Sequence, residues 1–271
     1  MCRHLAYVGA PIRMGTLLAD PPFSLVRQSW APRRQQHGVV NADGFGVGWY
    51  PLEPATGGSA SPPEPDLLPA AEPARHRGAG PVWADETFAE LARVIRTSAL
   101  LAAVRSATVG MVGGQSVAAA APFRRGPWLF SHNGALAGWP GSASRLGWGL
   151  DPGVLATLDA PTDSALLWAI TIDLIGRGKT PAAALTDMIA RVQDAGGGRA
   201  TVLLTDGRSI TATAWGTSLC WRRLPDGVVV ASEPYDDEPG WVDVPDRSLL
   251  TARPDAVAVE PLVPTQPGAD R

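Results

Sequence analysis

The sequence predicts a single α+β domain over residues 1–271, built around antiparallel sheets. Three observations support this fold class: strand patterns near both ends of the chain, helical patterns between them, and hairpin turns rather than βαβ connections. Hydrophobic residues make up 45% of the 271 residues, which is ample for a buried core.

Two strands are predicted in the first fifty residues. RHLAYVG at residues 3–9 combines β-branched and aromatic residues and ends in glycine. NADGFGVGWY at residues 41–50 alternates, with Gly44, Gly46 and Gly48 on one face and larger apolar residues on the other. The glycine face therefore admits the close approach of either a second backbone or a ligand.

The middle of the chain predicts a loop, a helix and two strands. Residues 51–81 are rich in Pro, Ala and Gly and predict a long surface loop. DETFAELARVIRTS, from residue 85, has helical spacing, and LLAAVRSATVGMV, from residue 100, predicts a strand. GPWLFSHNGAL, from residue 126, predicts a strand that runs into a tight turn at Asn133-Gly134.

Two helices and a series of hairpins complete the pattern. The first helix begins near Thr162 or Asp163 as N-cap and ends at Gly176, and the second has Thr180 as N-cap and Pro181 at its first position. Strand patterns then continue to residue 262, with Asp206-Gly207 and Asp226-Gly227 at the hairpin turns.

Composition narrows the class of function. A net charge of −3 argues against nucleic acid as a partner, and the apolar run at residues 165–175 is short and interrupted by Asp173, so we expect no membrane span. The N-terminus lacks a signal-peptide pattern, and a cytoplasmic location is expected. The two cysteines, Cys2 and Cys220, form neither a zinc spacing nor a disulfide framework, and we expect no metal and no cofactor.

Cys2 stands directly behind Met1, and aminopeptidases that remove the initiator methionine accept small second residues. A processed chain would begin with a cysteine that carries both a thiol and an α-amine. Because an α-amine titrates at about 7.7–8.0, it can accept the thiol proton and later return it. On position alone, the chance presence of a small residue is the simpler explanation of Cys2.

Three downstream features change that balance. Asn133 and Gly134 can donate hydrogen bonds to a developing oxyanion, or form an ordinary turn. Arg105, in an apolar strand pattern, needs a carboxylate partner, which is either structural or part of a substrate. Asp163 is either a helix cap or the partner of a substrate ammonium.

Taken in this order, Met-Cys2, RSATVG, HNG and Asp163 resemble the class II glutamine amidotransferases, which are N-terminal-nucleophile hydrolases. The resemblance implies a four-layer αββα sandwich and the hydrolysis of a γ-glutamyl amide through a glutamyl thioester. It also implies the roles of the residues: Cys2 as nucleophile with its α-amine as base, Asn133 and Gly134 at the oxyanion, Arg105 and Thr108 at the α-carboxylate, and Asp163 at the α-ammonium. Two departures stand out: Ala103 replaces a histidine usual two places before the arginine, and NADGFG replaces an Arg-Gly-Pro-Asp loop, which leaves Asn41 and Asp43 without an assigned role.

Within that family, MCRHLAYVGAP, LVRQSWAPRRQ and NADGFGVGWYP resemble the ergothioneine-pathway amidohydrolases, which release glutamate from γ-glutamyl-hercynylcysteine sulfoxide. The leaving half of that small molecule carries a trimethylammonium group, which one of the ten tryptophans can bind by cation–π contact; Trp30, Trp128 and Trp139 lie nearest the motifs. No protein partner is required. Three alternatives remain open: a free-standing glutaminase that supplies ammonia to a partner, a Cys–His hydrolase with His132 as base, and a non-catalytic binding module on the same fold.

Overall fold

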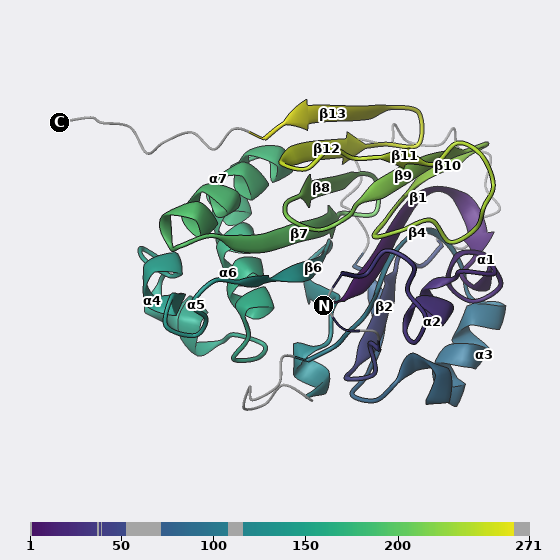
Figure 1. The fold of residues 1–271 in the computed structure, drawn as a ribbon, viewed down its shortest axis with the longest axis horizontal. Helices are drawn as coiled ribbons and strands as arrows, with labels where there is room; N and C mark the ends of the chain where they lie inside the picture. The colour runs from purple at the N-terminus through teal and green to yellow at the C-terminus, as the bar shows by residue number, and fades with distance from the viewer. Residues whose placement is uncertain (1, 37, 39, 53–71, 108–115, 263–271) are drawn as a thin grey trace, which may run out of the picture.

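The computed structural model describes residues 2–36, 38, 40–52, 72–107 and 116–262. Two antiparallel sheets pack face to face, and helices cover the outer face of each, so that four layers follow one another across the molecule (Figure 1). This arrangement confirms the predicted α+β class and the αββα order of layers.

The first sheet contains the N-terminal strand at its centre. Within the described residues it has seven strands in the order β11-β9-β10-β1-β4-β2-β3. Leu5 of the central strand is the Cα partner of Ala102 on one side and of Ala231 on the other. The strands are β1 (Arg3–Arg13), β2 (Phe45–Trp49), β3 (Ala74–Gly78), β4 (Arg96–Val104), β9 (Cys220–Leu224), β10 (Gly227–Ala231) and β11 (Val242–Asp243).

The second sheet has six strands among the described residues, in the order β13-β12-β8-β7-β6-β5. The predicted hairpins are confirmed, since residues 206–209 join two of these strands and residues 225–226 join β9 to β10. The strands are β5 (Phe123–Arg125), β6 (Trp128–Leu136), β7 (Gly198–Thr205), β8 (Ile210–Ala214), β12 (Ser248–Ala252) and β13 (Val257–Pro261).

The two long helices begin where the sequence predicts. Thr162 caps α6 (Asp163–Gly176) by accepting the N–H of Ala165 at 3.2 Å, and Thr180 caps α7 (Pro181–Asp194) by accepting the N–H of Ala183 at 3.3 Å. Together with the short α4 (Ala143–Leu146) and α5 (Pro152–Ala156), they lie on the left of Figure 1. On the right lie α1 (Gly15–Leu18), α2 (Leu25–Gln28) and α3 (Glu86–Val94).

Three apolar clusters fill the three interfaces between the layers, and the alternation of β1 shows which face is which. Leu5 and Tyr7 pack with residues of α1–α3, whereas Ala6 and Val8 pack with residues of the second sheet such as Leu129. The even-numbered side chains of β1 therefore face the other sheet.

The glycine face of β2 is packed against the second sheet. A Cβ atom on Gly46 would lie 2.4 Å from the carbonyl oxygen of Ala121, and one on Gly48 would lie 2.7 Å from a methyl carbon of Leu129. Of the two interpretations that the sequence allowed, the close approach of protein, and not a ligand floor, accounts for these glycines.

Three predictions about local structure are wrong. Asn133 and Gly134 form no turn, because β6 continues through them and pairs with Thr201 and Ala200 of β7. The predicted loop at residues 51–81 contains β3, although residues 53–71 lie outside the described part of the chain. The strand predicted from residue 100 ends at Val104, so that the half-buried Arg105 follows it.

Candidate active site

Cys2 and Asn133 meet at one end of the interface between the sheets. The backbone nitrogen of Cys2 donates a hydrogen bond to Oδ1 of Asn133 at 3.1 Å. Cys2 immediately precedes β1 and is half-buried, whereas Asn133 lies in β6 and is fully buried. The residue that the sequence predicts as nucleophile thus lies beside one of the two predicted oxyanion donors.

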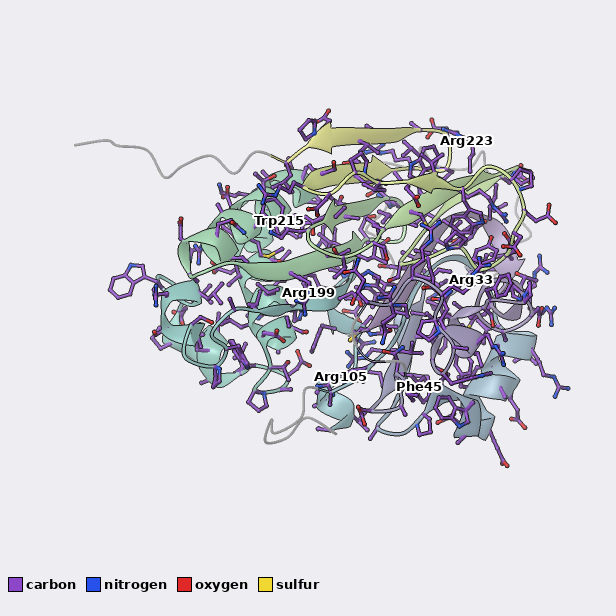
Figure 2. The ribbon with its side chains drawn as sticks, viewed as in Figure 1. Arg33, Phe45, Arg105, Arg199, Trp215 and Arg223 are labelled. Atoms are coloured by element: carbon purple, nitrogen blue, oxygen red, sulfur yellow. The ribbon has the colours of Figure 1, made fainter. Side chains whose placement is uncertain are left out.

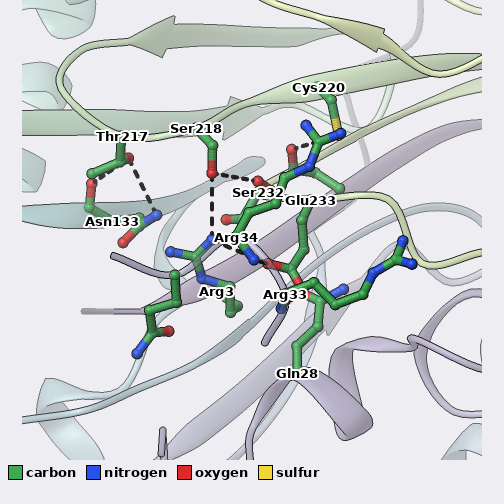
Figure 3. A network of polar contacts seen from close by, with 12 residues as sticks. Arg3, Gln28, Arg33, Arg34, Asn133, Thr217, Ser218, Cys220, Ser232 and Glu233 are labelled. Atoms are coloured by element: carbon green, nitrogen blue, oxygen red, sulfur yellow. Dashed lines mark hydrogen bonds and ion pairs between the residues drawn. The ribbon is translucent and has the colours of Figure 1, made fainter. Parts of the chain in front are cut away.

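The other end of the Asn133 amide contacts the loop between β8 and β9. Its Nδ2 donates to Oγ1 of Thr217 at 3.3 Å (Figure 3). Thr217 also supports the strand itself, since its hydroxyl lies 3.5 Å from the carbonyl oxygen of Asn133. No local pattern indicates this contact, because 84 residues separate the two partners.

Arg105 directly follows β4, the strand beside β1, just as Cys2 directly precedes β1. Arg3 is the Cα partner of Val104, so one further step in this antiparallel register would set Cys2 opposite Arg105. Figure 2 shows Arg105 at the lower edge of the sheets. Thr108, its predicted companion, lies outside the described residues.

Asp43, to which the sequence assigned no role, holds the segment that carries Arg105. Its backbone N–H donates to the carbonyl of Arg105 at 2.9 Å, and its Oδ2 accepts the N–H of Ala107 at 2.8 Å. Asn41 acts in the neighbouring loop, where its Nδ2 donates to the carbonyl of Gln28 at 3.1 Å. Both residues of the NADGFG segment therefore fix backbone around the candidate site.

Asp163 lies at the far end of β6. Its Oδ2 accepts the N–H of Leu136 at 3.2 Å, and its Oδ1 accepts the N–H of Ser164 at 2.8 Å. The carboxylate therefore joins the first turn of α6 to β6 at Leu136. This residue lies three positions after Asn133 on the same strand. Both interpretations of Asp163, as a structural residue and as a substrate contact, are compatible with this place.

Gly134 is a glycine because the strand beside it leaves no room for a side chain. A Cβ atom there would lie 1.9 Å from the carbonyl oxygen of Arg199 and 2.6 Å from Nε2 of His132. His132 shares this helix-facing side of β6, where Nδ1 lies 2.9 Å from Oγ of Ser164 and Nε2 lies 3.0 Å from the carbonyl oxygen of Arg199. With both ring nitrogens engaged on the face opposite Asn133, the geometry contradicts His132 as the base for Cys2.

A buried ion pair lies directly behind Cys2. Nε of Arg3 donates to the carbonyl of Cys2 at 2.9 Å, and Nη1 lies 3.6 Å from Oε2 of Glu233 (Figure 3). The two oxygens of Glu233 also accept the backbone N–H groups of Arg33 and Arg34, each at 2.8 Å. Burial lowers the pKa of Arg3, and the negative charge of Glu233 opposes that shift. Sequence reasoning missed this pair.

No sequence pattern indicates a role for His4 either. Its Nδ1 lies 3.1 Å from Oγ of Ser131, and its Cα partner on the adjacent strand is Ala103. The imidazole therefore stands beside the alanine that departs from the family motif. Complete burial, with the charge of Arg3 as a second cause, lowers the pKa of His4 well below its usual 6.5, so the ring is neutral near pH 7.

The three tryptophans nearest the motifs do not form one group of contacts. Trp128 and Trp139 pack against the core between the second sheet and α6–α7. Trp30 meets Trp83 edge to face, with ring centroids 5.5 Å apart, and the guanidinium of Arg27 lies 5.2 Å from its ring centroid. Of the three, Trp30 alone belongs to an exposed aromatic pair.

Neither a membrane span nor a metal-binding cluster is found in the described part of the chain. None of the helices described there is long and apolar enough to cross a bilayer. Likewise, those residues include no group of three or more His, Cys, Asp or Glu side chains placed to hold a metal ion.

Comparison with known proteins places this chain in a family. The family model of the class II glutamine amidotransferases matches residues 14–229, and the chain belongs to this family. A glutamine aminotransferase class-II domain protein from Silicibacter pomeroyi has the same fold, with a TM-score of 0.65, 23% identity, and coverage of 97% of this chain and 100% of that one. The phosphoribosylpyrophosphate amidotransferase of B. subtilis gives a TM-score of 0.61 at 15% identity, over 97% of this chain and 49% of that one.

Two proteins with a higher sequence identity to this chain share one name. The γ-glutamyl-hercynylcysteine sulfoxide hydrolase of Mycolicibacterium smegmatis is 41% identical over 269 residues, which cover 97% of this chain and 100% of that protein. A protein of the same name from Mycobacterium tuberculosis is 39% identical over 251 residues, 92% of each chain.

Proposed function

We propose that this protein hydrolyses the γ-glutamyl amide of γ-glutamyl-hercynylcysteine sulfoxide and releases glutamate, with Cys2 as nucleophile. The observation that carries the proposal is the 41% identity, over 97% of the chain, to a hydrolase named for that substrate. The Cys2–Asn133 contact supports it, because it places a thiol and an amide at one point between the sheets.

The first half of the reaction forms a thioester. After removal of Met1, the α-amine of Cys2 takes the thiol proton and Sγ attacks the γ-carbonyl carbon. Nδ2 of Asn133, exchanging Thr217 for the substrate, and the N–H of Gly134 donate to the oxyanion. The C–N bond then breaks, and the protonated α-amine returns its proton to the departing nitrogen.

The second half regenerates the enzyme. The amine product leaves, and water attacks the γ-glutamyl thioester while the α-amine of Cys2 takes a proton from it. The C–S bond breaks, which gives glutamate and the free thiol. Every proton transfer uses groups of this chain or water, so the proposed reaction needs no cofactor, metal or protein partner.

The glutamyl group is held at its α-carbon by two charged residues, Arg105 just after β4 and Asp163 at the start of α6. Arg105, with Thr108, binds the α-carboxylate, and Asp163 binds the α-ammonium. The register that pairs Arg3 with Val104, the neighbours of Cys2 and Arg105, supports the first assignment, and the location of Asp163 at the end of β6 supports the second. The leaving half, with its trimethylammonium group, extends away from these charges.

The test is the release of glutamate from two substrates by the purified full-length protein. We expect kcat/KM for γ-glutamyl-hercynylcysteine sulfoxide to exceed that for free glutamine, and Cys2→Ala to abolish both activities. A preference for glutamine would instead identify a glutaminase that supplies ammonia. Unchanged behaviour of Cys2→Ala in every assay would identify a non-catalytic binding module.

A further inference from the structure

We propose that His4 and Ser131 form a positioning pair that sets the separation between Cys2 and Asn133. This inference rests on the proposed function, in which Cys2 and Asn133 act together on one carbonyl group. Neither His4 nor Ser131 touches the reacting atoms in this scheme; they act through the strands that carry those atoms.

The two pairs are neighbouring links between the same two strands. His4 follows Cys2 by two residues in β1, and Ser131 precedes Asn133 by two residues in β6, so each lies on the same strand face as its neighbour. Nδ1 of His4 lies 3.1 Å from Oγ of Ser131, and the Cys2 nitrogen lies 3.1 Å from Oδ1 of Asn133. The His4–Ser131 link thus joins the sheets one step further into the interface.

The backbone of His4 is itself firmly held. Its N–H donates to Oγ of Ser232 at 3.0 Å, and its carbonyl accepts the N–H of Ser232 at 2.9 Å. With the main chain fixed on the β10 side, the imidazole spans the gap to the second sheet. Because β1 is held in this way, a change in the His4–Ser131 hydrogen bond shifts β6 and not β1.

Small residues make space for the ring. The Cα partner of His4 on β4 is Ala103, and the partner of Ala103 on β2 is Gly46. Next to the imidazole, this row of the sheet therefore carries only the methyl group of Ala103 and the hydrogen of Gly46. Side chains opposite one another on a strand pair compete for the same space. This face of the sheet therefore accommodates an imidazole at His4 because position 103 is an alanine.

Stability alone does not account for the pair. Both side chains are fully buried, and Nε2 of His4 has no hydrogen-bond partner among the described residues. A buried polar atom without a partner costs free energy that an apolar side chain of the same shape avoids. Polar groups retained at such a cost beside a candidate site indicate a role in geometry.

The benefit is a fixed distance between the nucleophile and the oxyanion donor, which lie on different sheets. A misplacement of about 1 Å at a reacting centre can lower a rate roughly 100-fold. Because the first sheet carries Sγ and the second carries the amide, the contacts between sheets near this end determine their separation. Among the described residues, His4–Ser131 is the next side-chain hydrogen bond between β1 and β6 after the Cys2–Asn133 contact itself.

Four variants of the full-length protein test the pair: His4→Leu, His4→Asn, Ser131→Ala, and His4→Leu combined with Ser131→Ala. With γ-glutamyl-hercynylcysteine sulfoxide, we expect His4→Leu to lower kcat by roughly 10- to 100-fold with KM within about threefold. His4→Asn, which keeps a polar atom near the place of Nδ1, should recover most of that loss. The double variant should be no slower than the slower single variant, because both changes break the same link.

Two further measurements distinguish positioning from a structural role. The midpoint of urea unfolding of the double variant, which leaves neither partner of the pair behind, should equal or exceed that of the parent. Iodoacetamide should alkylate Cys2 of His4→Leu at the parent rate. A parent-like kcat for His4→Leu, a loss of kcat in the double variant matched by a loss of stability, or multiplicative losses in the double variant would each overturn the pair. Failure of the parent protein itself to release glutamate would overturn the proposed function and this inference with it.

Discussion

The nitrogen of Cys2 donates a hydrogen bond to the side-chain oxygen of Asn133 across a separation of 131 residues. One partner begins the central strand of the first sheet, and the other lies in the second sheet. The packing of the two sheets, and not a local sequence motif, therefore brings the residues of the candidate site together.

An N-terminal extension that cannot be removed should abolish hydrolysis. With such a segment before Cys2, its nitrogen is a peptide amide and cannot take the thiol proton. Glutamate release by the extended protein is the measurement. The matched control carries the same segment followed by a protease site that cuts directly before Cys2, and cleavage should restore activity. Activity in the uncut protein would contradict the α-amine as base.

Replacement of Asn133 should affect the chemical step. We expect Asn133→Ala to lower kcat by about 10²–10³-fold, the usual effect of removing one oxyanion donor. Asn133→Asp keeps an oxygen for the Cys2 nitrogen but loses the donor, and it should be as slow as the alanine variant. Steady-state kinetics of both variants decide the point, since an active aspartate variant would mean that Asn133 serves only to hold Cys2.

Loss of Glu233 should destabilise the protein strongly. Glu233→Leu leaves the fully buried Arg3 without its counter-charge and the backbone N–H groups of Arg33 and Arg34 without an acceptor. We expect the free energy of unfolding to fall by about 3–5 kcal/mol, measured by urea denaturation. Asp237→Asn, which breaks the exposed ion pair with Arg33, is the control and should cost about 0–1 kcal/mol. Similar losses for the two variants would contradict the importance of burial.

The two glycines of β2 should differ in their tolerance of alanine. At Gly46 the new Cβ would meet a backbone oxygen at 2.4 Å, which cannot move without shifting the chain, and we expect a loss of about 1–3 kcal/mol. At Gly48 the nearest atoms are the methyl groups of Leu129, which can rotate away, so the loss should be smaller. Thermal unfolding of the two variants compares them directly. A greater loss at Gly48 would show that the side chains between the sheets are as rigid as the backbone.

Acid should destabilise the protein through His4. Since burial holds its folded-state pKa well below 6.5, the unfolded chain binds a proton near pH 6.5 that the folded chain, with Arg3 and His132 close to the ring, does not accept. Stability is therefore full above about pH 6.5 and falls below it, by up to about 1.4 kcal/mol per pH unit for one group. Urea denaturation at several pH values between 7.5 and 5.5 measures the slope, which should be smaller in His4→Leu. An identical slope in that variant would assign the effect to other groups.

Features that depend on neighbours in the sequence were predictable. The caps at Thr162 and Thr180 follow from side chains three residues before the N–H groups they accept, and the strand that begins at Arg3 follows from its own composition. The αββα order came from the resemblance to a family, because no local pattern shows which faces of two sheets meet.

Features that depend on distant strands were not predictable. An Asn-Gly pair usually forms a turn, but Asn133 and Gly134 gain partners on β7 that favour the extended chain. Arg3 looks like an ordinary charge near a terminus until Glu233 from 230 positions later lies beside it. The contact of Cys2 with Asn133 and that of His4 with Ser131 likewise require the register between sheets, which the sequence does not display.

The central place of β1 has a consequence for the order of events during synthesis. Its neighbours β4 and β10 end at Val104 and Ala231, so the first strand made completes its pairing only after about 230 residues have been synthesised. Throughout the interval before β10 emerges from the ribosome, the start of the chain has an open flank and lies within reach of an aminopeptidase. This interval gives an aminopeptidase time to expose the α-amine of Cys2 before β10 closes the second flank of β1.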